Sequence, residues 1–379
     1  MKTTKILITA PNLITGGAEK QLIYLIDGLV KLGFEVVLFL LELEGEYLAK
    51  VPKAVKILTP TSPKPRKPFK GLWKVKEIIK VTHKEDPDIL YSRLWPTKVA
   101  TAFAGFLLRK KVVFSEDRAL SRLIDEGGRG KANLKLHVRK TASQLAKVVV
   151  PVSQGIADEL EQIFKLCPEK VKLIYNGFDL EEMRKKAAEE VSHPWFNNRK
   201  EPVVGALGRM VELKGFKYLF EAIKIVNDEG IPVRLLMIGK GELLEELRTQ
   251  AERLGIKDRV EFLGFVENPF AYLARCDLFV LSSLYEGLPS TLIEAMALGL
   301  PVISTRCPTG PEEIIEDGKN GLLVPVADSK AIAEAIVRVL RDKDLNMRLR
   351  VEGKRRAEDF SLENMVSRFA DIFVNLSAQ

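Results

Sequence analysis

Short apolar runs alternate with helix-like stretches along almost the whole chain. In the first half the runs that predict strands are Ile6–Ala10, Glu35–Leu41, Ile89–Tyr91, Val112–Ser115 and Val148–Val152. Apolar residues at helical spacing lie between them, as in Ala18–Leu32, which ends at Gly33. Such regular alternation is typical of βαβ units around a parallel sheet. The first half therefore predicts one doubly wound α/β domain.

A polar stretch at residues 181–201 interrupts this alternation, which then starts again. The second series of predicted strands is Val203–Leu207, Arg234–Ile238, Val260–Leu263, Leu278–Leu281 and Val302–Ser304. The chain has 379 residues, more than the roughly 250 to 300 at which a single core stops growing. We therefore predict an α/β fold of two tandem Rossmann-like domains that face each other across a cleft, which would hold the active site. The predicted parts are a first domain at 1–180, a linker at 181–201, a second domain at 202–360 and a final helix at 361–379 that could cross back to the first domain.

The loop at residues 208–215 brings two cations to the end of the predicted strand Val203–Leu207. Arg209 offers a planar guanidinium and Lys214 a compact ammonium, and such groups together neutralise a diphosphate. With a nucleoside diphosphate as leaving group, they would stabilise the charge that grows as the bond breaks. Two surface cations beside a turn would leave the same pattern, so this loop alone does not decide between the two interpretations.

Two glutamates follow the predicted strand Leu278–Leu281 in the segment 285–295. Glu286 falls in the loop, and Glu294 falls early in the next helix. A carboxylate accepts hydrogen bonds from both hydroxyls of a vicinal diol, so acidic residues suit the recognition of sugars and ribose. The N–H groups at the helix start can hold phosphates. Two surface glutamates that flank a turn are the alternative that the spacing leaves open.

Two glycines, Gly16 and Gly17, end the loop between the first predicted strand and the first predicted helix. Backbone without side chains can approach a phosphate closely, and the unpaired N–H groups of a helix start favour negative charge. A simple strand-to-helix connection is the alternative. The position of this loop, directly after a strand, favours anion binding there.

The paired glutamates resemble a motif of glycosyltransferase family 4, whose members have the GT-B fold. Other segments resemble this family in the same order over nearly the whole chain: Gly16–Glu19, Val152–Ser153, Asn176–Asp179, Gly208–Arg209, Lys214–Gly215, Gly264–Phe265 and Gly321–Val324. The segment Arg306–Ile315 is similar to bacterial and archaeal members that build surface polysaccharides and lipid-linked glycans. The resemblance implies a hexosyltransferase that moves a hexose or N-acetylhexosamine from a nucleotide sugar, with a UDP-sugar as the expected donor. The expected acceptor is a glycan or a polyprenyl-pyrophosphate-linked glycan.

The resemblance also implies roles for the charged residues. Glu294 would bind the ribose hydroxyls, and Glu286 would face the hydroxyls of the donor sugar as a binding residue and not as a general base. Arg209 and Lys214 would hold the diphosphate, and these two with Glu286 are the expected catalytic residues. Family members typically retain the anomeric configuration and need no metal ion. We therefore expect no cofactor and no metal site, the nucleotide sugar being a substrate.

The other expected donor contacts follow from the same resemblance. Gly16 and Gly17 would close over the diphosphate, which Thr291 would also touch. Phe265 and Val266 would border the base. The full donor-binding set is then Gly16, Gly17, Arg209, Lys214, Phe265, Val266, Glu286, Gly287, Leu288, Thr291 and Glu294.

One segment departs from the family pattern. Many relatives carry a sugar-contacting His after the fourth strand, where this chain has Ser115–Arg118 and no histidine. Arg93, Glu116 and Arg118 are therefore candidate contacts to the sugar or the acceptor. Another segment, Asp86–Asp88, spells the metal-binding DxD motif of a different glycosyltransferase fold. It precedes a strand, at the wrong end of the sheet, so we interpret it as a turn.

Positive charge gathers in the first half of the chain. Residues 1–150 hold 28 Lys and Arg against 14 Asp and Glu, and the remaining residues hold 31 against 37. The resulting net charges of +14 and −6 predict attraction of the first half to an anionic surface such as membrane headgroups. A solvated, Lys-rich face is the alternative. The predicted helix at 71–83 could lie on such a membrane or pack as an ordinary crossover helix.

Other sequence features limit the expected location of the protein and its alternative functions. No apolar run approaches the roughly 18 residues that span a bilayer, and three scattered cysteines fit a reducing compartment. We expect a cytoplasmic protein that could bind the inner face of the membrane. The alternatives are a GDP-mannose-dependent mannosyltransferase, a sugar-nucleotide epimerase or phosphorylase, and a non-catalytic nucleotide-sugar-binding protein. No nucleic-acid-binding module is recognisable, so nucleic acid is not an expected partner.

Overall fold

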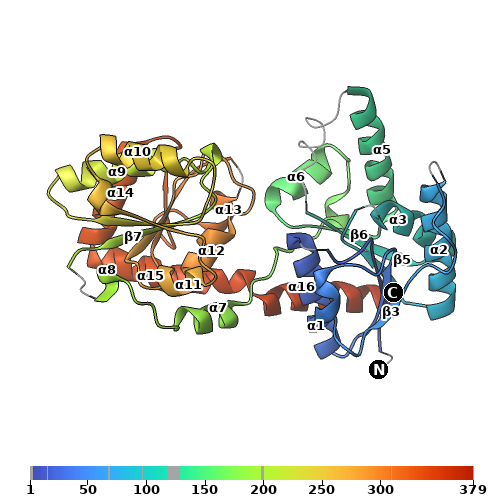
Figure 1. Cartoon of the computed structure of the whole chain (residues 1–379). Helices are drawn as coiled ribbons and strands as arrows, with labels where there is room; N and C mark the ends of the chain where they lie inside the picture. Colours follow the sequence, from blue (N-terminus) through green and yellow to red (C-terminus); the bar gives the residue numbers. More distant parts are fainter. Residues whose placement is uncertain are drawn as a thin grey trace. The chain divides into compact units, whose positions relative to one another are not determined.

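The computed structural model describes residues 3–14, 16–66, 69–95, 97–117, 129–197, 200–308 and 310–378, without the side chains of 129–133 and 135. The chain forms two compact units (Figure 1). Unit 1 comprises Met1–Gly177 and Leu362–Gln379, and unit 2 comprises Phe178–Ser361.

Unit 1 is built on a six-stranded parallel sheet in the order β3-β2-β1-β4-β5-β6. Its strands are β1 (Lys5–Ala10), β2 (Glu35–Leu40), β3 (Lys56–Leu58), β4 (Ile89–Ser92), β5 (Lys111–Glu116) and β6 (Val148–Pro151). This is the strand order of the Rossmann fold, whose topological switch lies between β1 and β4. The sequence analysis missed β3 because this short edge strand is mostly exposed and carries no continuous apolar run.

Helices cover both faces of this sheet. On one face α1 (Gly17–Lys31) packs against α16 (Leu362–Ser377), as Figure 1 shows in blue and red. A Cβ atom on Gly28 of α1 would lie 2.4 Å from Val366 Cγ2, so the glycine permits this close approach. The core of the other face includes side chains of α2 (Lys70–Glu85), α3 (Thr97–Leu108), α5 (Arg129–Leu145) and α6 (Gln154–Gln162).

Unit 2 repeats the same plan with a six-stranded parallel sheet in the order β12-β11-β10-β7-β8-β9. The strands are β7 (Val203–Leu207), β8 (Arg234–Ile238), β9 (Val260–Gly264), β10 (Leu278–Leu281), β11 (Val302–Thr305) and β12 (Leu322–Val324). The helices are α9 (Phe216–Asp228), α10 (Leu244–Arg253), α11 (Pro269–Leu273), α12 (Ser290–Ala297), α13 (Pro311–Ile314), α14 (Ser329–Arg341) and α15 (Lys343–Ala357). Read from β9, the order is again that of the Rossmann fold, with its switch between β7 and β10. Two Rossmann-like α/β domains are thus confirmed.

The sequence predicts a linker at residues 181–201. The structure places two helices there, α7 (Leu180–Ala187) and α8 (Pro194–Asn197), within unit 2. Asn268 Nδ2 donates to the carbonyl oxygen of Lys186 at 2.9 Å, which ties α7 to the start of α11. These helices are short and polar, so the sequence carries little periodicity to find them. The final helix, α16, lies in unit 1, and the units divide after residues 177 and 361.

No helix in the described part of the chain is both long enough and apolar enough to span a bilayer.

Candidate active site

Two loops of unit 2 meet where its strand order reverses. They follow the adjacent strands β7 and β10 and contain the predicted diphosphate loop, 208–215, and the predicted glutamate loop. The N–H of Leu284 donates to the carbonyl oxygen of Leu213 at 2.8 Å, and Ser282 Oγ donates to that of Lys214 at 3.0 Å. Ligands of doubly wound sheets bind outside the strand carboxyl ends at this switch. The two loops singled out in the sequence therefore lie where a ligand is expected.

An ion pair joins these loops. Lys214 Nζ donates to Glu286 Oε1 at 2.6 Å, and Ser283 Oγ donates to the same oxygen at 2.6 Å. The side chains of Lys214 and Glu286 are only 21% and 11% exposed. The contact holds the lysine in place, and its ammonium has three donors, so it can serve a phosphate as well as Glu286.

The end of β11 and a third loop, which follows it, support the glutamate loop. Thr305 Oγ1 donates to the carbonyl oxygen of Ser283 at 2.5 Å. Gly310 has φ +82°, and a Cβ atom there would lie 1.9 Å from the carbonyl oxygen of Gly287. Glycine is needed for both reasons, the left-handed backbone and the close approach. The backbone beside Glu286 is thus fixed by packing as well as by hydrogen bonds.

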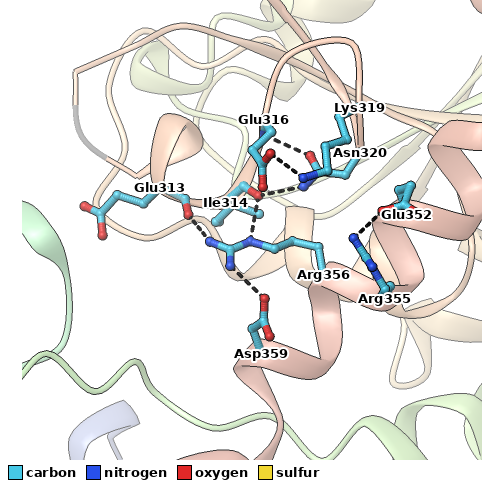
Figure 2. A network of polar contacts seen from close by, with 9 residues as sticks. All are labelled: Glu313, Ile314, Glu316, Lys319, Asn320, Glu352, Arg355, Arg356 and Asp359. Atoms are coloured by element: carbon cyan, nitrogen blue, oxygen red, sulfur yellow. Dashed lines mark hydrogen bonds and ion pairs between the residues drawn. The ribbon is translucent and has the colours of Figure 1, made fainter.

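Arg356 of α15 fastens the far end of this third loop (Figure 2). Its Nη2 donates to the carbonyl oxygen of Glu313 at 2.5 Å, and its Nε donates to that of Ile314 at 3.2 Å. These carbonyl groups end α13, which begins directly after Gly310. A cation at a helix C-terminus is favourable because the last carbonyl groups carry partial negative charge.

The helix α12 begins next to the ion pair. Thr291 lies in its first turn, and the Oγ1 atom is buried without a hydrogen-bond partner among the described residues. A buried hydroxyl without a partner is costly, so this atom marks a place where a polar ligand would be favourable. Glu294 follows one turn later and is half-buried. Both residues predicted from the sequence therefore lie at the start of α12, where N–H groups favour an anion.

The remaining predicted donor contacts of unit 2 are more exposed. Arg209 follows β7, and its side chain is exposed. Among the described residues, it has no hydrogen bond to the Lys214–Glu286 pair. Phe265 follows β9 and is 72% exposed, with Lys240 Nζ 5.7 Å from its ring centroid. Val266, Gly287 and Leu288 range from half-buried to exposed. An exposed aromatic ring beside a strand end is suited to stacking on a base.

The reasoning from sequence missed Ser283 and Cys307. Ser283 follows a fully buried strand in a Ser-Ser pair, and that polar pair directly after β10 was the available signal. Cys307 is 1% exposed, and burial followed by the charge of Glu286 raises the pKa of its thiol to about 11. Cys307 therefore carries no thiolate at neutral pH, and it acts here as a packing residue.

In unit 1, Gly16 and Gly17 lie at the start of α1. Gly16 precedes the helix in an extended conformation, with φ 179°, and its carbonyl oxygen accepts from the N–H of Lys20 at 3.0 Å. A Cβ atom on Gly16 would lie 2.2 Å from Glu19 Oε2, whereas one on Gly17 would meet nothing within 4 Å. The Glu19 carboxylate ends a flexible side chain that can move aside, so local packing requires neither glycine. The closure of both glycines over a diphosphate stays a prediction.

Buried charges gather at the carboxyl ends of β4 and β5 in unit 1. Arg93, 1% exposed, donates through Nη2 to Asp117 Oδ1 and to Asn176 Oδ1, each at 2.5 Å. Burial opposes its charge, but the Asp117 carboxylate outweighs this effect and raises the pKa of Arg93. Lys98 Nζ lies 3.3 Å from Glu116 Oε2, and burial lowers the pKa of Lys98.

Three polar atoms of this cluster are buried without a hydrogen-bond partner among the described residues: Arg93 Nε, Trp95 Nε1 and Glu116 Oε1. Two of them are donors and one is an acceptor, a combination that a hydroxyl-rich ligand can satisfy. The candidate contacts Arg93 and Glu116 thus lie in one cluster, whereas Arg118 lies outside the described residues.

Asp86–Asp88 forms a turn, as predicted. Asp86 ends α2 in the left-handed conformation and pairs with Lys110 at 2.7 Å. Asp88 Oδ2 accepts from the N–H of Lys5, the first residue of β1, at 2.8 Å. In the described ranges, no three His, Cys, Asp or Glu side chains lie close enough together to hold a metal ion.

Comparison with known proteins extends this description to almost the whole chain. A family model described as "Glycosyltransferase Family 4" matches residues 15–182, and one described as "Glycosyl transferases group 1" matches residues 188–356. An uncharacterized glycosyltransferase of Methanocaldococcus jannaschii is 28% identical over 80% of this chain and 82% of its own length.

Two further relatives carry more informative names. The N-acetylgalactosamine-N,N'-diacetylbacillosaminyl-diphospho-undecaprenol 4-alpha-N-acetylgalactosaminyltransferase of Campylobacter jejuni is 30% identical over 57% of this chain and 56% of its own length. The crystal structure of HepE from Anabaena in complex with UDP superposes with a TM-score of 0.75 at 23% identity, over 99% of this chain and 100% of that one. The structural likeness establishes the shared fold.

Proposed function

The chain belongs to glycosyltransferase family 4, and we propose that it is a retaining, metal-independent transferase of a hexose or N-acetylhexosamine. Its proposed donor is a UDP-sugar, and its proposed acceptor is a glycan or a polyprenyl-pyrophosphate-linked glycan. The HepE structures with UDP and with UDP-glucose support the choice of donor. The Campylobacter relative, named for a diphospho-undecaprenol acceptor, supports a lipid-linked acceptor.

One observation carries the proposal: the Lys214–Glu286 pair lies at the switch of the second sheet, next to the helix that holds the Thr291 hydroxyl, which is buried with no partner among the described residues. Lys214 with Arg209 would hold the diphosphate, and Thr291 would donate to a phosphate oxygen. Glu286, held by Lys214 and Ser283, would accept from the sugar hydroxyls. These groups stabilise charge that develops on the leaving diphosphate, and such stabilisation is a large part of catalysis.

The proposed reaction keeps the sugar's anomeric configuration. The bond between the anomeric carbon and the diphosphate oxygen breaks, and the acceptor oxygen bonds to the same carbon on the same face. The acceptor's hydroxyl proton passes to a donor phosphate oxygen, so the products are the glycoside and the nucleoside diphosphate. No carboxylate of the chain is needed as a base, and Glu286 remains a binding residue.

We further propose that the buried cluster of unit 1, with Arg93, Trp95 and Glu116, binds the sugar hydroxyls of the acceptor. Arg93 Nε and Trp95 Nε1 would donate to sugar hydroxyls, and Glu116 Oε1 would accept from them. Replacing Glu116 with Gln should raise the acceptor KM and leave the affinity for UDP unchanged. Weaker UDP binding with an unchanged acceptor KM would contradict this assignment.

A donor panel tests the proposed activity. The chain is incubated with UDP-glucose, UDP-N-acetylglucosamine, UDP-N-acetylgalactosamine and GDP-mannose in EDTA, with and without a membrane lipid extract, and released nucleoside diphosphate is measured. We expect release from a UDP-sugar that increases with the lipid extract. Release that requires an added divalent ion would exclude metal independence, and preference for GDP-mannose would exclude the UDP donor. Binding without turnover would indicate a nucleotide-sugar-binding protein, and the product's anomeric configuration tests retention.

A further inference from the structure

Two neighbouring helices of unit 1 expose large apolar side chains. Leu72 of α2 is 72% exposed, and Phe106 and Leu107 of α3 are 62% and 61% exposed. Phe69, at the N-cap of α2, is 65% exposed, and Phe103 is 38% exposed. Single exposed apolar side chains are ordinary on a protein surface, but a group of them on two packed helices marks an interaction site. We call these five residues the apolar patch.

Three residues of the patch, Leu72, Phe103 and Leu107, line one groove. Leu72 and Val75 of α2 face Val99, Phe103 and Leu107 of α3 across a groove of about 430 Å³. The spacing of these residues along each helix is helical, so each helix turns one apolar stripe toward the groove. The opposite side of α2 is buried in unit 1 through Trp73, Ile78 and Val81. The helix therefore packs on the sheet and also keeps an apolar stripe exposed.

Most of the charges around this groove are positive. The described residues of α2 and α3 include two carboxylates, Glu77 and Glu85, and these are only 2% and 7% exposed. The lysines of α2 on or near the surface are Lys70, Lys74, Lys76, Lys80 and Lys84. Arg109, directly after α3, is also exposed. The nearby loop adds Lys64, whose partner Glu42 is an acidic group on this side of the unit.

The lysines lie close enough to influence one another. Lys74 lines the groove itself, and burial, followed by the positive charges of Lys64 and Lys70, lowers its pKa. Like charges held together favour an anionic partner that relieves their repulsion. Long lysine side chains beside exposed Leu and Phe can reach phosphate groups while the apolar residues enter a less polar layer.

We propose that the apolar patch and the lysines around it are a docking surface for an anionic lipid bilayer, with Leu72, Phe106 and Leu107 entering the layer of headgroups. This arrangement matches interfacial helices, which combine apolar burial with attraction to anionic lipid. The inference adds a site to the proposed function and rests on the exposure and charge of unit 1. For a polyprenyl-linked acceptor, the surface would bring the enzyme to the membrane that holds its substrate.

Vesicle flotation tests the surface directly. The full chain is mixed with vesicles of phosphatidylcholine alone or with added phosphatidylglycerol. We expect recovery with the anionic vesicles that falls with added salt, and little recovery with the neutral ones. The Leu72→Ser/Phe106→Ser variant should lose at least about tenfold of its partition into anionic vesicles, and Lys70→Glu/Lys76→Glu should lose a similar amount. Both pairs of residues are on the surface, so the melting temperature should not change.

A matched control uses two exposed apolar residues of α15 in unit 2. Met347 and Val351 are 62% and 57% exposed, and Met347→Ser/Val351→Ser should bind vesicles like the unchanged chain. Equal recovery of all variants, or equal recovery with neutral and anionic vesicles, would overturn the proposal. A dimer that Leu72→Ser/Phe106→Ser abolishes in the absence of lipid would show that a second copy covers the patch, and this would also overturn it.

The activity assay keeps this inference separate from the proposed function. Nucleoside diphosphate release with a water-soluble acceptor should be the same in Leu72→Ser/Phe106→Ser and in the unchanged chain, whereas release with a vesicle-bound acceptor should fall. A chain that binds vesicles but transfers no sugar would contradict the proposed reaction alone. One that transfers sugar but binds no vesicles would contradict the docking surface alone.

Discussion

At the scale of single residues, the candidate site depends on how Lys214 is held. Its ammonium donates to Glu286 Oε1 at 2.6 Å, and Glu286 is held in turn by Ser283. We expect Lys214→Ala to lower kcat by about 100- to 1000-fold, because a donor aimed at developing negative charge is worth about that much. The measurement is steady-state release of nucleoside diphosphate.

Lys217→Ala is the matched control for this prediction. Lys217 lies three residues further on, pairs with Glu212 at 2.6 Å and is 43% exposed. It should lose little activity, because its exposed ammonium pairs with Glu212 and takes no part in the Lys214–Glu286 contact. If both variants kept normal turnover, Lys214 would have no place in the site.

The Thr291 hydroxyl gives a second prediction, in which affinity and stability change in opposite directions. Oγ1 is buried without a partner among the described residues, so Thr291→Val should leave the free energy of unfolding unchanged or raise it by about 1 kcal/mol. The affinity for UDP should fall by the equivalent of about 1.5 to 3 kcal/mol, the usual value of a hydrogen bond to a charged group. Calorimetric titration and urea unfolding measure the two effects. Thr291→Ser, which keeps the hydroxyl, should bind UDP normally, and a large loss of affinity there would point to packing instead.

Residue types and their places after strands were enough to single out Glu286 and Lys214 as candidates, because strand ends at the switch of a doubly wound sheet are where ligands bind. Thr291 was expected only from the resemblance to the family. The supporting contacts were not predictable in the same way. Ser283 reaches Glu286 only because the loop turns back after β10, and Gly310 approaches Gly287 from a loop more than twenty residues away in sequence. Such contacts depend on three-dimensional packing, which a pattern of residue types does not specify.

At the scale of elements, the attachment of α2 provides a pH-dependent prediction. Glu77, 2% exposed, accepts from Ser62 Oγ at 2.7 Å, from the N–H of Thr61 at 2.7 Å and from Lys80 Nζ at 2.7 Å. Burial opposes its ionisation, but these hydrogen bonds outweigh burial and lower its pKa to about 2. The carboxylate thereby joins the loop at residues 61–62 to α2.

The sign of the pH effect follows from this lowered pKa. A carboxyl group whose pKa is lower in the folded chain stabilises the fold above its unfolded pKa, here about 4.5, and the stabilisation is lost as the pH falls toward 2. Glu77→Gln should therefore cost about 2 to 3 kcal/mol at pH 7 and much less near pH 3. Urea unfolding at both pH values measures this difference. The control is Glu169→Gln, at an exposed residue of the same unit, and an equal pH dependence of both variants would contradict the assignment.

Most central strands were predictable because β1, β2, β8 and β10 are continuous apolar runs, as parallel strands buried on both faces must be. Edge strands and helices of only one or two turns were not predictable in this way. The helix α7 was not predicted because it buries only Leu180 and is otherwise polar. For α2 the sequence left open a crossover helix or a surface helix. The structure has it packed on the sheet with one stripe exposed, so these two alternatives do not exclude each other.

At the scale of the whole molecule, the two units differ in how the chain builds them. Unit 2 is one continuous segment, and its two ends lie together, since the N–H of Phe178 donates to the carbonyl oxygen of Phe360 at 2.9 Å. Unit 1 needs two segments. α16 contributes Phe369 and Phe373 to its core, where their ring centroids lie 5.7 and 5.8 Å from that of Tyr91. The sequence showed that a final helix exists, but its place depends on contacts with residues several hundred positions earlier.

This difference predicts that the units behave differently when separated. A fragment of residues 178–361 should unfold cooperatively and bind UDP, because it has its own core and holds Lys214, Glu286 and Thr291. A fragment of residues 1–177 should not fold, since the loss of Phe369 and Phe373 alone removes about 1.5 to 3 kcal/mol per side chain from a total of about 5 to 15. Circular dichroism during urea unfolding distinguishes these outcomes. A peptide of residues 362–379 added to the 1–177 fragment should restore cooperative unfolding, and the same peptide with Phe369→Ser and Phe373→Ser should not. Cooperative unfolding of 1–177 without any peptide would contradict this prediction, because it would show that the core of this segment is stable without α16.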